Sequence, residues 1–449
     1  MDRRSFIKFL TAASAVSACT VMPDMFHPNG SAVFGATSAT TTPAKTLLVI
    51  FQRGANDGIN TVIPYGDPNY NKTLRPTLFL DQAVSGQVLK LTNQSFFGLH
   101  PSLTYLQEAF NNGKLALMPA VHWSEAPRSH FDAQKIIELG KSNLTGYDPA
   151  TATGWLNRYL VQRQSATPVS LRAIGLESSL IESLHGAVPV SVYSDLSRVN
   201  GSLSSTEAAA LSADQANVYN QAPATDLEAD TYTMGKTFVQ DLSVLRPIDF
   251  AKAPVDNGAV YSSSTFDTQL RQIATLIKAN LGLEIATASI GGWDSHLNQG
   301  GVTGMQATSL SALNNGLKAL MTDLGSTLAA NLVVLVMTEF GRTAAETASF
   351  GTDHGKASCW MVLGGPVKGR VYGRAITGGF ANTSPYTGSN GWPGLSSTQL
   401  DSGRFLKNNV DYREILGEIL NKHLGMSTTA LASILPGYTY NTANALGFL

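Results

Sequence analysis

Short apolar runs rich in β-branched residues recur along the chain. They cover residues 47–51, 115–121, 283–290, 332–338 and 360–363. Polar and apolar positions do not alternate within them, which is typical of strands buried on both faces. Segments with apolar residues at helical spacing stand between these runs, near 101–110, 129–140, 154–160, 266–281, 310–324 and 411–424. The repeated order of strand and helix predicts an α/β fold, with a mainly parallel sheet flanked by helices on both faces.

The middle of the chain follows this order less clearly. Residues 170–262 mix short strand-like pieces with a polar helix around 204–220. We expect an irregular insertion there, or a cap over the sheet. The residues with candidate chemistry come from both ends of the chain and have to meet, so residues 47–449 are predicted to form a single domain.

The N-terminus carries an export signal. Residues 2–8 read DRRSFIK and precede a short apolar stretch over 9–18. This pattern indicates a twin-arginine signal and therefore the twin-arginine export machinery as a partner, whereas the alternative is a basic, disordered N-terminus. We predict a signal peptide with a small-residue segment over 1–36 and a tether over 37–46. The protein would then be periplasmic or extracellular.

Two alternative cleavage sites for the signal peptide are consistent with the sequence. Cys19 follows Val16-Ser17-Ala18, which fits a lipoprotein cleavage site and would leave the protein lipid-anchored at Cys19. Cleavage between Ala32 and Ala39 would discard that cysteine instead. In both cases Cys359 is the only free thiol that remains, so an internal disulfide is excluded.

Composition narrows the choice of partners. The formal net charge is −1 and only 14% of the residues are charged, so there is no basic surface for nucleic acid. After the signal there is no second long apolar run, and we expect no transmembrane helix in the mature chain.

Acidic and histidine side chains follow three of the predicted strands. They are Asp57, Asp294, His296, Glu339, Asp353 and His354. Ligands bind beyond the carboxyl ends of parallel strands, and carboxylates with imidazoles are suited to a divalent ion. The pattern predicts a site for zinc, manganese, calcium or iron. Each residue alone also has a simpler explanation, such as a turn at Asp57-Gly58 or an ion pair between Glu339 and Arg342.

Three further residues are candidates for catalysis. Ser129 and His130 open a predicted helix, where a hydroxyl would face unpaired backbone N–H groups and could act as a nucleophile. Ser129 with Asp132 also makes an ordinary helix cap. Arg342 is a candidate oxyanion clamp. His122, near a strand end, is held in reserve.

These residues lie in motifs that resemble a known family. The motifs are RGANDG (53–58), LHP (99–101), SHFD (129–132), GWLNR (154–158), GWDSH (292–296), TEFGRT (338–343) and DH (353–354). Together they resemble the set that marks exported bacterial proteins with domain of unknown function 1501. That family is in turn similar to the alkaline phosphatase and sulfatase superfamily, whose members hold two metals and use a nucleophile at a helix N-terminus.

The resemblance implies an alkaline-phosphatase-like fold and a role for each matching residue. Asp57 would be the first-strand metal ligand and Ser129 the nucleophile, and Asp294 with His296 would bind one metal. Glu339 stands where the superfamily has the aspartate of an Asp-His pair. Phe340 replaces the histidine of that pair, and the gap between Asp294 and His296 is shortened, which leaves His354 as the candidate replacement.

The sequence therefore predicts an exported metal-dependent hydrolase of phosphate or sulfate esters, with a small-molecule or polymer substrate. The alternative is a non-catalytic binding or assembly protein of the cell envelope that retains the hydrolase fold.

Overall fold

A computed structural model of the protein describes residues 44–163, 171–199, 205–219, 226–374, 380–381 and 391–449. The predicted signal, with Cys19, and most of the predicted tether lie outside the described residues. Across the described ranges, no helix combines the length and the apolar character needed to cross a membrane.

The centre of the described structure is an eight-stranded sheet. Its order is β13 (Val410–Asp411), β5 (Leu115–His122), β10 (Ser358–Gly364), β9 (Leu332–Thr338), β1 (Thr46–Gln52), β8 (Ile285–Ile290), β6 (Ala173–Leu176) and β7 (Ser191–Val192). Only β10 runs antiparallel to its neighbours, and the other pairs are parallel. Each residue of β1 is buried. Its side chains alternate between two cores, with Leu48 and Ile50 in one and Leu47 and Val49 in the other.

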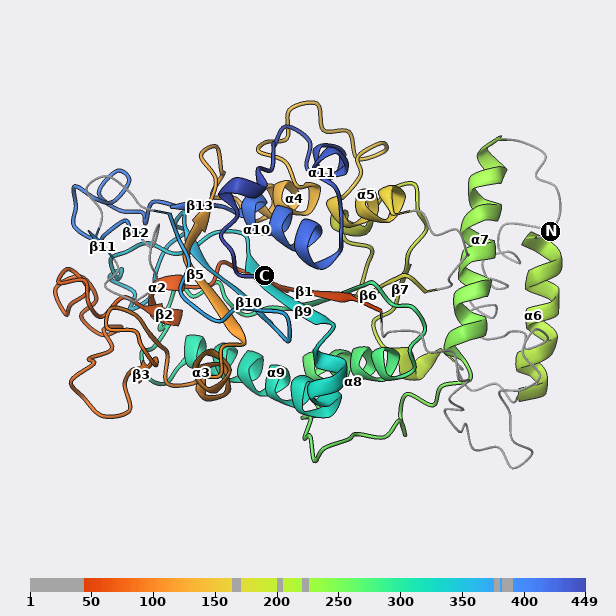
Figure 1. Ribbon diagram of the computed structural model, residues 1–449, viewed down its shortest axis with the longest axis horizontal. Coiled ribbons are helices and arrows are strands. Elements are labelled where there is room, and N and C mark those ends of the chain that lie inside the picture. The colour runs from red at the N-terminus through yellow and green to blue at the C-terminus, as the bar shows by residue number, and fades with distance from the viewer. Residues whose placement is uncertain (1–43, 164–170, 200–204, 220–225, 375–379, 382–390) are drawn as a thin grey trace.

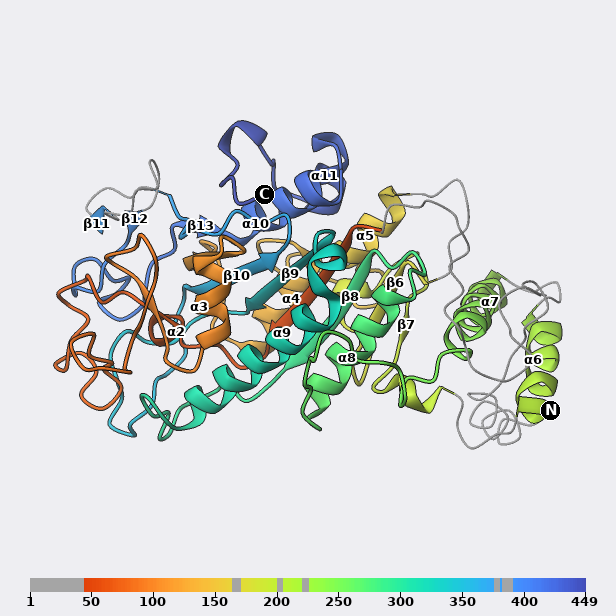
Figure 2. The ribbon, with the colours of Figure 1, turned by 60° about the horizontal axis from the view of Figure 1, so that its bottom comes forward.

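Helices cover both faces of this sheet (Figures 1 and 2). One face packs against α4 (His130–Leu139), α5 (Trp155–Gln162), α10 (Tyr412–Glu418), the π turn η4 (Ile419–His423) and α11 (Thr428–Ile434). The other packs against α3 (Thr104–Asn111), α8 (Thr265–Lys278) and α9 (Met305–Ala329). The predicted α/β fold with a mainly parallel sheet is confirmed.

Small elements complete the described chain. They are α2 (Gly58–Thr61), the three-stranded sheet of β2 (Val62–Ile63), β4 (Gly98–Leu99) and β3 (Leu89–Lys90), the pair of β11 (Phe380–Ala381) and β12 (Gly391–Trp392), and the 3-10 turns η2 (Glu182–Leu184), η3 (Leu196–Arg198) and η5 (Thr442–Asn444).

The middle of the chain differs from the prediction. The expected insertion over 170–262 begins with β6 and β7, which extend the main sheet at one edge. These strands have four and two residues, too few for a strand pattern to stand out in the sequence. The helices α6 (Ser205–Tyr219) and α7 (Asp226–Leu245) follow, and they lie side by side beyond that edge (Figure 1, right). Of the two alternatives, an insertion or a cap over the sheet, the cap is not what these elements form.

A buried histidine ties the C-terminal helices to the first strand. Nε2 of His423, at the end of η4, donates a hydrogen bond of 3.0 Å to the carbonyl oxygen of Thr46. Burial lowers the pKa of His423 to about 4. The folded state therefore holds this imidazole neutral.

We predict an acid-sensitive contribution from His423 to stability. Between pH 6.5 and about 4 the unfolded chain binds a proton that the folded chain does not, so the free energy of unfolding should fall over this range by up to about 3 kcal/mol. His423→Gln should flatten this part of the dependence of stability on pH, measured by urea unfolding. The matched control is His185→Gln, at a partly exposed position. Equal slopes in wild type and His423→Gln would contradict the assignment.

Candidate functional site

The site residues lie at one edge of the sheet. β1, β8 and β9 are parallel, and β5 points the same way because both β5 and β9 are antiparallel to β10. The loops that leave β8 and β9 carry Asp294, His296 and His354, and His130 opens α4 directly after the loop that leaves β5. These four residues are called the histidine cluster below.

The imidazoles of the histidine cluster meet through their Nε2 atoms. Nε2 of His354 lies 3.0 Å from Nε2 of His130 and 3.1 Å from Nε2 of His296. The Asp294 carboxylate reaches the same point. Its Oδ1 lies 2.9 Å from Nε2 of His296 and 3.3 Å from that of His354, and its Oδ2 lies 3.5 Å from that of His130. All three histidines are partly exposed, so the cluster is open to solvent.

The outer nitrogen of each imidazole is held by an oxygen. The Nδ1 pairs are His130 with Oε1 of Glu339 (2.8 Å), His296 with Oδ1 of Asp353 (3.1 Å) and His354 with the carbonyl oxygen of Arg128 (2.9 Å). A carbonyl oxygen can only accept, and an ionised carboxylate likewise. In the neutral form, the carbonyl oxygen of Arg128 fixes the His354 proton on Nδ1 and the lone pair on Nε2. His130 and His296 have a carboxylate oxygen near both ring nitrogens, and the tautomer with the proton on Nδ1 leaves their Nε2 lone pairs free as well.

This tautomer directs the Nε2 lone pairs at one another. Two lone pairs about 3 Å apart repel unless a proton or a metal cation lies between them. A tetrahedral ion with bonds of about 2.0–2.1 Å has ligand atoms about 3.3 Å apart. The five spacings given above, from 2.9 to 3.5 Å, bracket that value. His130, Asp294 and His354 form the group whose ligand atoms all lie within 4.8 Å of one another, and His296 adjoins it through His354 and Asp294. The donor set thus fits a divalent cation, and the oxygen-held Nδ1 atoms are the usual second layer of such sites.

The local electrostatics differ among the cluster residues. The hydrogen bond with Glu339 raises the pKa of His130, whereas burial lowers the pKa of His354. Burial alone would raise the pKa of Asp294, but the hydrogen bond and charge of Arg342 outweigh it and lower the pKa. Asp294 is therefore an anion near neutral pH.

Glu339 and Asp353 support imidazoles, which differs from their predicted role as metal ligands. Glu339 is buried, and its Oε1 accepts hydrogen bonds from the backbone N–H of Gly54 (2.9 Å), from Gln134 (2.9 Å) and from His130. Because Oε1 of Glu339 accepts three hydrogen bonds, it has little capacity left to ligate an ion. Asp353 is half-exposed and holds His296 in the same way.

Arg342 does not have the geometry of an oxyanion clamp. Its side chain is buried, Nη1 donates to Oδ1 of Asp294 at 2.6 Å, and Nε donates to Oγ1 of Thr352 at 3.2 Å. Nη2 donates to the carbonyl oxygen of Thr352. Each nitrogen is thus bound within the protein, and Arg342 is a positioning residue for Asp294.

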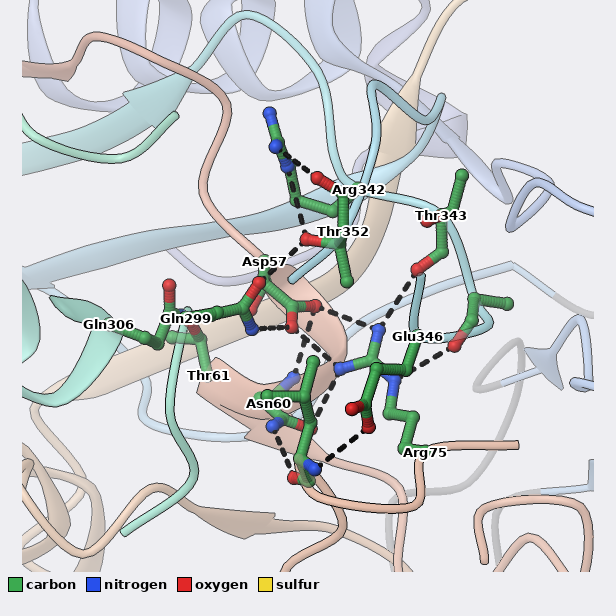
Figure 3. Close-up of polar contacts among 12 residues, drawn as sticks. Asp57, Asn60, Thr61, Arg75, Gln299, Gln306, Arg342, Thr343, Glu346 and Thr352 are labelled. Carbon is green, nitrogen blue, oxygen red and sulfur yellow. Dashed lines mark hydrogen bonds and ion pairs between the residues drawn. The ribbon is translucent and has the colours of Figure 1, made fainter. Parts of the chain in front are cut away.

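Asp57 lies outside the histidine cluster, contrary to its predicted role as a metal ligand. Its carboxylate and the Arg75 guanidinium are both fully buried and form a bidentate pair, with distances of 2.6 and 3.1 Å (Figure 3). Nε2 of Gln299 donates a third bond of 2.6 Å to Oδ2, and Oδ1 accepts one of 3.4 Å from the backbone N–H of Asn60. Its oxygens are therefore taken up by protein donors.

A chain of hydrogen bonds connects this pair to the cluster. Oε1 of Gln299 accepts from Oγ1 of Thr352 at 2.6 Å, and the same oxygen of Thr352 accepts from Nε of Arg342 (Figure 3). Arg342 in turn donates to Asp294. Gln299, Thr352 and Arg75 have no sequence spacing that marks them as site residues. Only the fold shows their role.

Ser129 and His122 have structural roles. The Ser129 hydroxyl accepts from the backbone N–H of Asp132 at 3.4 Å and caps α4, and Gly140 ends this helix with a φ of 63°. His122 is buried at the end of β5, with its ring 4.8 Å from that of Trp123, and burial lowers its pKa to about 3.

We predict that Asp57→Asn destabilises the protein whether or not metal is present. It would leave Arg75 as a buried, unpaired charge, which should lower the free energy of unfolding by about 3–5 kcal/mol. The measurement is urea unfolding of chelated and metal-supplemented protein.

The double variant Asp57→Asn/Arg75→Met is the control for this prediction. It removes both charges, so we expect it to be more stable than Asp57→Asn alone. A destabilisation seen only with metal present would instead identify Asp57 as a ligand.

Comparison with known proteins gives a family and no activity. The sequence profile described as "Protein of unknown function (DUF1501)" matches residues 44–387. No curated protein matches this sequence.

Proposed function

Because the chain belongs to the DUF1501 family, which is defined by sequence and not by an activity, we propose its function from the chemistry of its site. We propose that it is a metal-dependent hydrolase of phosphate or sulfate esters that acts outside the cytoplasm. The observation that carries the proposal is the convergence of three Nε2 atoms on the Asp294 carboxylate, with each Nδ1 held by an oxygen.

Within this proposal His130, Asp294, His296 and His354 hold one divalent ion. Zinc is the best match, because imidazoles dominate the donor set, and manganese, iron and calcium follow. The ion would supply Lewis acidity for the hydrolysis. Glu339 and Asp353 keep the imidazoles in the tautomer that leaves Nε2 free, and Arg342 keeps Asp294 ionised and in place.

Water, not Ser129, is the nucleophile in this proposal. The Ser129 hydroxyl caps α4, and across the described residues its oxygen has no hydrogen-bond partner that could act as a base. The Asp353 carboxylate is half-exposed beside the cluster and is the candidate proton acceptor.

Export supports the location of this activity. The twin-arginine pattern over residues 2–8 supports a location in the periplasm or outside the cell, with or without a lipid on Cys19. The pathway carries folded proteins, so the ion can be bound before export.

One observation favours the second candidate, a non-catalytic binding or assembly protein of the envelope. The two residues that resemblance and sequence assign to nucleophile and clamp, Ser129 and Arg342, are both committed to structural hydrogen bonds. A protein that binds metal but cleaves no ester would support this candidate.

We predict about one bound divalent ion per chain and its loss in His354→Ala. His354 contacts each of the other three cluster residues, so its removal opens the donor set. The measurement is elemental analysis of protein exported through its own signal and then dialysed. His185→Ala is the matched control and should keep the ion. Equal metal content in wild type and His354→Ala would overturn the proposed site.

We predict that Ser129→Ala lowers the stability of the protein but leaves hydrolysis of the ester largely unchanged. Loss of the helix cap should reduce the free energy of unfolding by about 1 kcal/mol. Hydrolysis of an aryl phosphate or aryl sulfate by the metal-loaded protein should stay within about 10-fold of wild type, since a nucleophile would cost far more. Ser129→Asn keeps a capping group without a hydroxyl and should restore stability. A loss of about 1,000-fold in both variants would make Ser129 the nucleophile.

A further inference from the structure

Two arginines meet on one aromatic ring beside the histidine cluster. The guanidinium carbon of Arg128 lies 4.4 Å from the centre of the Phe405 ring, and that of Arg404 lies 5.4 Å from it. Phe405 is buried, whereas Arg128 is exposed and the Arg404 side chain is 60% exposed. Their guanidinium groups therefore rest on a buried platform and face solvent.

The backbone fixes these arginines close to the cluster. The carbonyl oxygen of Arg128 accepts the Nδ1 proton of His354. The carbonyl oxygen of Arg404 accepts from the N–H of Ala344 at 3.0 Å, two residues after Arg342. Nη2 of Arg404 lies 3.8 Å from Oδ2 of Asp353, which holds His296. Both arginines are thus in direct contact with a cluster residue or with a residue that supports one.

The two positive charges are poorly neutralised. Throughout the described ranges no carboxylate lies within 4.0 Å of the Arg128 guanidinium, and the contact with Asp353 is the only ion pair of Arg404. Two like charges gathered on one ring repel each other, and an anion between them would remove that repulsion. A guanidinium stacked on a ring keeps its edge N–H groups free, and these match the oxygens of a phosphate or sulfate.

We propose that Arg128 and Arg404 bind the tetrahedral oxyanion of the substrate ester beside the histidine cluster. This inference rests on the proposed function and specifies its substrate class, a phosphate or sulfate ester. It gives the clamp role to two exposed arginines instead of the buried Arg342. The pair positions the ester, and the cluster provides the site of hydrolysis.

The test is calorimetric titration of the full exported chain with inorganic phosphate and, in a second arm, inorganic sulfate. Each arm is run on metal-loaded and on chelated protein. Arg128→Gln/Arg404→Gln should bind the preferred anion at least about 10-fold more weakly than wild type in both forms. Its metal content should be unchanged, because neither side chain is in the donor set. The arm with the tighter wild-type binding identifies the ester.

The matched control removes two positive charges elsewhere. Arg163→Gln/Arg198→Gln breaks the ion pairs with Glu284 and Asp195 and should leave anion affinity within about 2-fold of wild type, since screened surface charges at a distance contribute little. Arg128→Lys keeps the positive charge but lacks the planar guanidinium, so its anion affinity should lie between those of wild type and Arg128→Gln/Arg404→Gln.

Two failures can be told apart. If the chain holds metal but its anion affinity is the same in wild type and in Arg128→Gln/Arg404→Gln, or if wild type binds neither anion, the clamp is wrong and the metal site stands. If the chain holds no metal but binds the anion in an arginine-dependent way, the proposed hydrolase is wrong and the clamp stands.

Discussion

The arrangement of the loops around the histidine cluster depends on the buried ion pair between Asp57 and Arg75. Both side chains are withdrawn from water, and such a pair persists only when its remaining donors and acceptors are satisfied. Arg75 does this by donating to the carbonyl oxygens of Ala344 (2.8 Å) and Thr343 (3.1 Å), and Asp57 by accepting from Gln299 (2.6 Å). The pair thereby joins the turn after β1 to the loops after β8 and β9. These are loops that have to lie in register for the histidine cluster to form.

The same network determines how firmly the cluster is held. Asp294 is only half-buried, but the residue that orients it, Arg342, is buried and fixed by Thr352, which Gln299 connects to Asp57. A carboxylate held through a continuous set of buried hydrogen bonds loses little entropy on binding an ion. Gly54 adds a steric constraint, because a Cβ at this position would lie 2.8 Å from the backbone nitrogen of Asp294. Buried residues thus position the partly exposed side chains of the histidine cluster.

Much of the fold could be predicted from the sequence, because the central strands and long helices have strong local patterns. The run over 332–338 coincides with β9, and the helix between Ser129 and Gly140 begins and ends at its predicted caps. Two features could not be predicted. The antiparallel direction of β10 leaves no trace in a run buried on both faces, and β6 with β7 are too short to show a period.

For the site, residue type and position after a strand were sufficient to predict that Asp294, His296 and His354 lie close together, because parallel strands place their carboxyl ends on one edge of the sheet. Residue type and position could not distinguish residues that could ligate a metal from residues that accept a hydrogen bond from an imidazole or an arginine. Glu339 and Asp57 follow strands in the same manner, but each meets a buried partner that comes from a distant part of the chain, His130 and Arg75. That choice depends on tertiary contacts, which spacing along the sequence does not contain.

Phe340 indicates why one ion is the better proposal than the two that the resemblance implies. The resemblance noted in the sequence would put a histidine at this position. The Phe340 ring stacks on His130 with centroids 4.9 Å apart and lies 5.1 Å from His354. A phenyl ring there closes the space beneath the imidazoles with apolar surface and offers no ligand atom. With Asp57 bound to Arg75 as well, two of the positions expected for a second ion are taken up by packing and by an ion pair. An apolar floor lowers the local dielectric, which strengthens the attraction between a single cation and the Asp294 carboxylate. The loss of ligands and the gain of Phe340 thus act in the same direction, towards a compact site with one centre.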